Sequence, residues 1–307
     1  MYDIVGIGGS FHDNLILMKR FPVDNTKNNP VLEVIKQGGG PVSTALCAAS
    51  RLGASCAVMT TFGDDPEGDF LKSDFLKDNV DISHSVTREG TSSHTCYVLV
   101  SKDTGNRTIC GKGGTVGRFK NGEINFDLIK SAKVFLVDGS SGEAGLCGAK
   151  YARENSVKVM LDAESPSPEM REVMKHTDFL ITSEQCMYEY GESEDIRHCL
   201  ENAFAKGRHD IVVATLGNKG GMGYDGVNFI EYPIYPAPVV DTNGCGDVFH
   251  GAFAYGFIQG WSYDKICRFS SGVSSMKCMK LGGRSGIPTL PQLVEWLTPY
   301  YDLSKHN

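Results

Sequence analysis

Short apolar runs alternate with longer amphipathic stretches along most of this chain. Runs rich in β-branched residues have the length and character of buried strands at 3–7, 56–61, 134–137, 157–162, 179–182 and 211–215. Stretches with apolar residues at helical spacing lie between them at 42–52, 67–78, 143–155 and 197–206. This alternation predicts the α/β class, with a mainly parallel central sheet and helices on both of its faces.

Two segments break this alternation. Residues 14–36 and 90–109 have the pattern of strands joined by turns, at Asp24-Asn25 and Gly105-Asn106, with no helix between them. Such insertions predict a small antiparallel lid beside the main sheet, across a crevice. The chain shows no internal repeat and no inter-domain linker, so we expect residues 1–307 to form a single domain that carries this lid.

Charge and hydropathy exclude two classes of partner. The chain has 30 Lys and Arg against 37 Asp and Glu, a net charge of −7, and no basic stripe of the kind that binds nucleic acid. No apolar run approaches the roughly 18 residues that cross a bilayer, and the first residues lack the basic region of a signal peptide. We therefore expect a cytoplasmic protein that binds neither nucleic acid nor membrane.

The cysteines and histidines do not form a metal site. None of the 10 cysteines belongs to a C-x-x-C pair or lies at finger spacing from a histidine, and no H-E-x-x-H occurs. These spacings predict reduced, mostly buried thiols and disfavour a zinc enzyme.

The 36 glycines cluster beside apolar runs, and the cluster after the first strand is a weak signal. The run from Gly6 to Gly9 lacks the third glycine of a dinucleotide fingerprint because Phe11 takes its place, and no P-loop motif occurs. The run Gly38-Gly39-Gly40 enters a helix. It is either a tight strand-to-helix turn or a place where bare backbone admits a polar ligand.

The segment 239–252 is more specific. An apolar strand end leads through Gly244, Cys245 and Gly246 into a helix of small residues, so several free N–H groups point the same way and can bind phosphate charge. Asp247 lies in the first turn of this helix. Alone it would be an acid that favours the helix dipole. Beside an anion hole it is better interpreted as the general base for a hydroxyl that attacks the γ-phosphate.

These motifs resemble a known family. DTNGCGDVFHGAF resembles the C-terminal signature of the ribokinase-type (PfkB) carbohydrate kinases, usually written D-T-x-G-A-G-D, and GGGPVSTALCAASRLG resembles their N-terminal signature. GDDPEGDFL, TLGNKGG and the tail from RFSSGVSSMKCMK onward extend the likeness over nearly the whole chain. Within the family, GGGP, DVFHGA and KC-x-x-x-GGR-x-GIP look most like the sulfofructose kinase branch.

The resemblance implies a ribokinase-like three-layer domain with a β lid, which phosphorylates a sugar hydroxyl with ATP. It implies Mg²⁺, with a monovalent cation as a further candidate, and a homodimer joined through the lids. It makes Asp247 the catalytic base and assigns the anion hole to the backbone of Gly244, Cys245 and Gly246. The matched sugar-binding positions are Asp13, Gly39, Gly40 and Thr44, and the matched nucleotide-binding positions are Thr215, Gly217, Gly220 and Ser271.

Several positions depart from the family pattern. Thr44 stands where many members carry a sugar-binding Asn, and residues 183–186 lack the Asn and the final Glu of the N-x-x-E motif that organises Mg²⁺, so we assign no metal ligand. Lys27 matches a cation that the sulfofructose branch uses for an anionic substrate, but Ser140 replaces the matching arginine. Arg107, in a stretch similar to ketohexokinases, is either a phosphate contact or a solvated lid arginine.

Two other functions stay open at this point. A nucleoside kinase of the same fold would need a base pocket in the lid, for which Phe11, Phe21 and Tyr97 are the candidate walls. A non-catalytic sugar- or nucleotide-binding regulator would have kept the fold and lost the chemistry, although the intact Asp247 argues against it.

Overall fold

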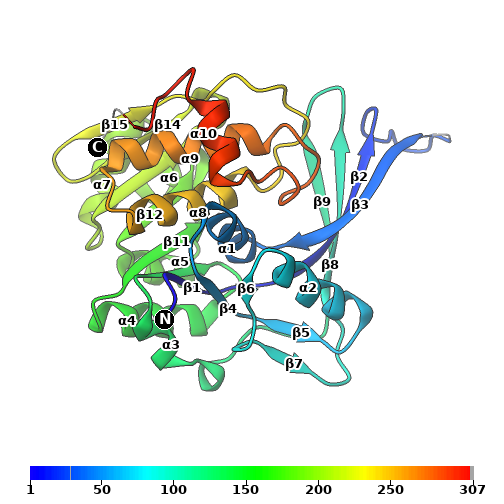
Figure 1. The fold of residues 1–307 in the computed structure, drawn as a ribbon, viewed down its shortest axis with the longest axis horizontal. Coiled ribbons are helices and arrows are strands. Elements are labelled where there is room, and N and C mark those ends of the chain that lie inside the picture. The colour runs from blue at the N-terminus through cyan, green and yellow to red at the C-terminus, as the bar shows by residue number, and fades with distance from the viewer. Residues whose placement is uncertain (28, 305–307) are drawn as a thin grey trace.

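The computed structural model describes residues 1–27 and 29–304 and has a large nine-stranded sheet at its centre (Figure 1). The strands run in the order β15-β14-β13-β12-β11-β10-β1-β4-β6. All neighbours from β6 to β13 are parallel, whereas β14 and β15 are antiparallel additions at one edge. Their bounds are β1 Ile4–Ile7, β4 Cys56–Met59, β6 Val80–Asp81, β10 Val134–Asp138, β11 Lys158–Ala163, β12 Phe179–Ser183, β13 Ile211–Thr215, β14 Gly221–Tyr224 and β15 Phe229–Tyr232.

Helices cover both faces of this sheet because successive strand residues point to opposite sides. In β1, Ile4 belongs to the core on one face, whereas Val5 and Ile7 belong to the core on the other. The first face carries α1 Pro41–Leu52, α2 Pro66–Lys77, α8 Cys245–Ile258, α9 Tyr263–Lys277 and α10 Leu290–Leu297. The second carries α3 Phe126–Ser131, α4 Gly142–Glu154, α5 Pro168–Lys175, α6 Glu184–Gly191 and α7 Ile196–Ala205. The predicted three-layer α/β class is confirmed.

The elements expected from the apolar pattern are all present, with small differences at their ends. The run 56–61 is divided, since Thr60 separates β4 from β5 (Thr61–Gly63), which pairs with β7 (Val86–Arg88) in a sheet of its own. Two single-turn 3₁₀ helices, η1 Asn121–Glu123 and η2 Gly217–Lys219, complete the set.

A second sheet of four strands, here called the small sheet, stands to one side of the large one (Figure 1). Its order is β3-β2-β8-β9, with bounds β2 Phe11–Met18, β3 Val31–Gly39, β8 His94–Ser101 and β9 Arg107–Lys112. The strands therefore reach beyond 14–36 and 90–109. The expectation of an antiparallel sheet was wrong for the central pair, because β2 and β8 are parallel. Each begins a separate hairpin, so no tight turn connects them.

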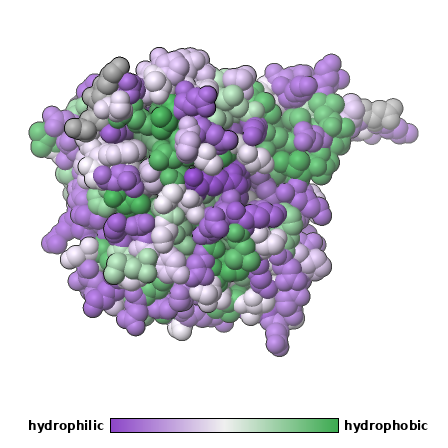
Figure 2. All heavy atoms as spheres, in the orientation of Figure 1, coloured by the Kyte–Doolittle hydropathy of each residue, from purple (hydrophilic) through white to green (hydrophobic). Residues whose placement is uncertain are grey.

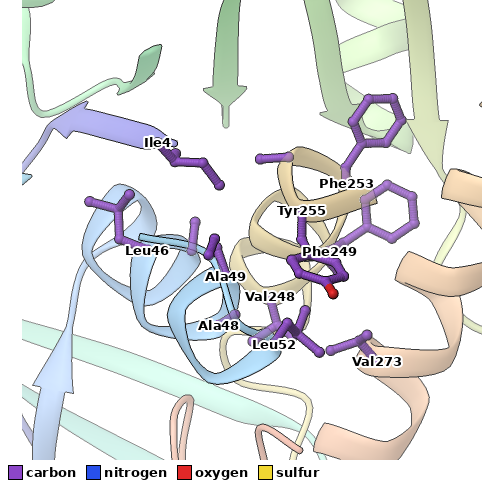
Figure 3. Packing of buried hydrophobic residues seen from close by; sticks show 14 of the residues in the cluster. Ile4, Leu46, Ala48, Ala49, Leu52, Val248, Phe249, Phe253, Tyr255 and Val273 are labelled. Carbon is purple, nitrogen blue, oxygen red and sulfur yellow. The ribbon is translucent and has the colours of Figure 1, made fainter. Parts of the chain in front are cut away.

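Helices α1 and α8 pack in unusually close contact at the centre of the first face (Figure 3). Ala48 and Ala49 of α1 lie against the α8 side chains around Val248, where larger residues would hold the helices apart. A Cβ on Gly251 would lie 2.1 Å from the carbonyl oxygen of Ala45. The position of α8, and with it the N-terminal turn that carries Asp247, therefore depends on this glycine.

We expect Gly251→Ala to lower the free energy of unfolding by about 1–3 kcal/mol, since backbone has to move to admit the methyl group. Gly246→Ala in the same helix is the matched control, because a Cβ there meets nothing within 4 Å. Its effect should stay below about 1 kcal/mol. Urea denaturation measures both values, and equal stability of the two variants would contradict the packing argument.

Candidate active site

Acidic side chains meet where the parallel strands of the large sheet end. Asp138 ends β10 and is paired in register with Asp162 of β11, while Asp247 approaches from α8 and Asp13 from the small sheet. Burial raises the pKa of Asp13, Asp138 and Asp162, and the charge of Asp247 raises each of them further. Ligands of open α/β sheets bind at this edge. Only Asp13 and Asp247 were identified from sequence, although the position of the other two at strand ends was a usable signal.

The N-terminus of α8 is open. It begins at Gly244, which has a φ of 74° and whose Cβ would lie 2.8 Å from the Cα of Gly283. No side chain of the described residues caps it, whereas α2, α5, α6, α7 and α9 are capped by Asp or Ser oxygens. The amide of Cys245 donates weakly to Thr242 at 3.4 Å, and Gly246 is exposed with open space around it. Uncapped amides and the positive end of the helix dipole can hold an anion here.

Asp247 lies in the first turn of this open helix, half-buried beside the uncapped amides. Burial raises the pKa of its carboxyl, and His250, Arg107 and Lys277 oppose this effect. Arg107 is exposed on β9 and reaches the α8 loop, with Nη1 3.2 Å from Oγ1 of Thr242. The structure thus brings Arg107 together with Asp247 and the expected anion hole.

The Gly38–Gly40 run makes room for polar groups. A Cβ on Gly39 would lie 2.2 Å from Oδ2 of Asp13, and a Cβ on Gly38 would lie 2.5 Å from a guanidinium nitrogen of Arg284. Gly40 is the N-cap residue of α1 and has a φ of 100°. Glycine adopts this backbone conformation readily, so the turn into the helix favours glycine here. The turn interpretation therefore holds for Gly40, whereas Gly38 and Gly39 give room to the side chains of Arg284 and Asp13, and contact of this backbone with a ligand stays a prediction.

Arg284 is the residue of this region that the sequence interpretation missed. Its guanidinium is 2% exposed and donates to Oδ2 of Asp74 at 3.2 Å, to the carbonyl oxygen of Gly39 at 3.2 Å and to Oγ1 of Thr44 at 3.5 Å. Burial raises the pKa of Asp13 to about 7, and Arg284 opposes that rise. The only sequence signal was an arginine after two glycines in the tail, with nothing to show that it is buried.

The residues matched to nucleotide binding surround the end of β13. Thr215 ends that strand and donates to the carbonyl oxygen of Thr182 at 3.2 Å. Gly217 and Gly220 have φ values of 58° and 87° in the turn that follows. Ser271 of α9 is buried, and its hydroxyl donates to the carbonyl oxygen of Pro233. The Ser271 hydroxyl therefore holds the backbone at Pro233, directly after β15.

Of the remaining positions, Lys27 is not joined to the site, whereas residues 183–184 lie beside the turn that follows β13. Lys27 is exposed in the β2–β3 connection, which projects away from the large sheet (Figure 1), and no bond within the described residues links it to the other positions. Ser183 caps α6 by accepting the amide of Cys186 at 3.4 Å, and Glu184 pairs with Lys219. Across 1–27 and 29–304, no three His, Cys, Asp or Glu side chains are arranged to hold a metal ion.

The pKa of Asp13 predicts a change of stability with pH in the substrate-free protein. The folded state keeps this proton up to about pH 7, whereas an unfolded aspartate loses it near pH ~3.9. The stabilisation of the folded state by the protonated Asp13 is thus fully present below pH ~4. It falls as the pH rises and is lost above about pH 7, where a charged carboxylate is buried. We expect Asp13→Asn to gain up to about 3 kcal/mol of stability relative to wild type between pH 5 and 8.

Denaturation curves at several pH values measure this difference. Asp103→Asn, at an exposed turn of the small sheet, is the control and should follow wild type at every pH. If the difference between Asp13→Asn and wild type does not change with pH, Asp13 does not carry the burial cost described.

Comparisons with known proteins show the family to which this fold belongs. The profile of the pfkB family of carbohydrate kinases matches residues 13–290. The chain is 29% identical over 241 residues to fructoselysine 6-kinase from Escherichia coli, covering 76% of this chain and 84% of that one. It is 26% identical over 286 residues to 5-dehydro-2-deoxygluconokinase from Geobacillus thermodenitrificans, with coverages of 85% and 83%.

The fold is similar to that of Arabidopsis thaliana ribokinase, solved with ribose and ATP, at a TM-score of 0.82 and 21% identity over 96% of this chain and 98% of that one. The sulfofructose kinase branch stays a hypothesis. None of the helices in residues 1–27 and 29–304 has the length and apolar character that a membrane span requires. The chain belongs to the PfkB family of carbohydrate kinases and is an ATP-dependent phosphotransferase that acts on a sugar hydroxyl.

Proposed function

We propose that Asp247 is the general base of this sugar kinase and that the open N-terminus of α8 stabilises the transferred phosphoryl group. The observation that carries the proposal is the combination of uncapped amides with a carboxylate in the same helical turn. Asp13 and the backbone of Gly39 and Gly40 hold the sugar on the opposite side. The charge of Asp247 raises the pKa of Asp13, so each carboxylate is within the electrostatic influence of the other, which supports a shared site.

In the proposed reaction, Asp247 takes the proton of a sugar hydroxyl as its oxygen bonds to the γ-phosphorus and the bond to ADP breaks. Such transfers pass through a loose transition state in which positioning and charge stabilisation dominate. The amides of Gly244 to Gly246 offset the developing phosphoryl charge. Arg107, which already reaches the α8 loop, adds a cation at the same place.

ATP enters such a site with Mg²⁺, and the carboxylates here fit a divalent cation. Asp162 and Glu164 lie at and beyond the end of β11, and the pKa of each is raised by burial and then by the charge of Asp247. A cation would relieve this excess of negative charge. Mg²⁺ keeps several waters and binds through few carboxylates, so Asp162 and Glu164 would hold it, and when bound it would neutralise phosphate charge.

We expect Asp247→Asn to lower kcat by about 10²–10⁴, the usual contribution of general base catalysis, with little change in ATP or sugar binding. A coupled ADP-release assay over ketoses, aldoses, sugar phosphates, sulfosugars and nucleosides finds the acceptor, and calorimetry measures binding. Turnover near the wild-type rate in Asp247→Asn would remove the base role.

We also propose that the whole chain works as one kinase domain in the cytoplasm, with the small sheet as its lid and as the interface of a homodimer. This sheet carries apolar side chains that are 43–57% exposed, at Val31, Leu32, Val34, Tyr97 and Ile109. Figure 2 shows hydrophobic residues gathered on this part of the surface. Exposed apolar patches mark association surfaces, and a lid that covers the sugar would exclude water from the reaction. The ten free thiols suit a reducing compartment.

A charge placed in this patch should separate the proposed dimer. We expect Val34→Asp to give the mass of one chain in light scattering, where the wild type gives that of two, because a buried unpaired carboxylate is costly. Val227→Asp, at a position 81% exposed outside the small sheet, is the matched control and should leave the mass unchanged. A monomeric wild type at micromolar concentration would contradict the proposal.

A further inference from the structure

Lys277 is a fully buried lysine in the last turn of α9. Its Nζ donates to the carbonyl oxygen of Asp241 at 3.1 Å and to that of Asn243, and it lies 4.0 Å from Sγ of Cys245. Within the part of the chain that the structure describes, no carboxylate forms an ion pair with it. Burying an amino group is costly unless its donors are satisfied, so these carbonyl contacts are the reason that it is tolerated here.

The two carbonyls belong to the loop that leads into α8. In a trans peptide the C=O and the following N–H point in opposite directions, and the chain has no cis peptide among its described residues. Drawing the carbonyl of Asn243 toward Lys277 therefore turns the amide of Gly244 the other way. That amide is the first of the proposed anion hole.

The other side of the loop is held by Asp241, which is also fully buried. Its carboxylate accepts the amide of Asn243 at 2.8 Å and the amide of Gly282 at 2.8 Å. The Asp241 carboxylate thus ties an amide of the loop to the segment after α9, and the Lys277 amino group holds two carbonyls of the loop. With the carbonyls held on the Lys277 side, the open amides of α8 are left to a ligand.

We propose that Lys277 is a positioning residue of this kinase, an internal cation that orients the anion-hole amides in place of a bound monovalent cation. Main-chain carbonyl oxygens beside a buried carboxylate are suitable ligands for a cation such as K⁺. Here the amino group already uses those carbonyls, so the monovalent cation expected from the family resemblance does not fit at this loop. The inference rests on the proposed role of the α8 amides in phosphoryl transfer.

The test removes the amino group and offers a free cation in its place. Wild-type kcat should not change between 100 mM K⁺ and 100 mM tetramethylammonium, which is too large for the loop. In tetramethylammonium, kcat of Lys277→Ala should fall about 10²-fold, as for the loss of an anion-hole donor, with the KM for sugar little changed. Adding K⁺ or NH₄⁺ should then raise kcat of Lys277→Ala at least about tenfold, because the truncated side chain leaves space for the cation beside the two carbonyls.

Lys265→Ala is the matched control. Lys265 is a second buried lysine of α9, but its Nζ lies over the ring of Trp261 at 4.6 Å, away from the loop. Its kcat should show no dependence on the cation. Circular dichroism establishes that each variant is folded, and if Lys277→Ala is not, Lys277→Met replaces it, with the loss of kcat as the readout.

Three results would overturn the inference. They are a wild-type enzyme that needs K⁺, a folded Lys277→Ala that keeps its full kcat in tetramethylammonium, and a folded Lys277→Ala that no small cation restores. Asp247→Asn, measured in the same buffers, separates this inference from the proposed function. Full turnover in Asp247→Asn rejects the base role, whereas a normal loss there combined with an unaffected Lys277→Ala rejects only the role of Lys277.

Discussion

The close contact between α1 and α8 is the constraint on which the rest of the site depends. Because Gly251 brings α8 onto the carbonyl oxygen of Ala45, the N-terminal turns of both helices are held near the ends of the parallel strands. The two turns are then used differently. The N-terminus of α1 is occupied, since Asp138 accepts the amide of Val42 at 3.1 Å. Among the described residues, no side chain caps the N-terminus of α8, which is why we propose it as the phosphate site.

Charge balance is the second consequence of that geometry. Several carboxylates lie around Asp247, and burial and mutual repulsion raise the pKa of each. Three cations oppose these rises in pKa, since Arg284 acts on Asp13, and Arg107 and Lys277 act on Asp247. The net charge of −7 therefore does not prevent phosphate binding, which depends on these local groups.

The sequence predicted the large elements well and the supporting residues poorly. Strands of the large sheet are short continuous apolar runs rich in β-branched residues, which their length and composition identify. Asp247 was found because a Gly-x-Gly turn precedes it, and Asp13 because of the family resemblance. Arg284 and Lys277 both lie in the KC-x-x-x-GGR-x-GIP stretch of the tail, but nothing in the sequence showed that they are buried, since a cation in a polar segment is usually solvated. The parallel pairing of β2 and β8 was missed because pairing between separate hairpins is not encoded in either one.

By itself, the sequence determined the α/β class, the order of the elements and the place of Asp247 in the first turn of a helix, because these depend on local patterns and on neighbouring residues. Tertiary structure alone decided which charges became neighbours. Gly39 gives space to the carboxylate of Asp13, and the loop before α8 receives Lys277 from the next helix. Both depend on packing between segments distant in the chain, where burial turns ordinary surface residue types into parts of a site.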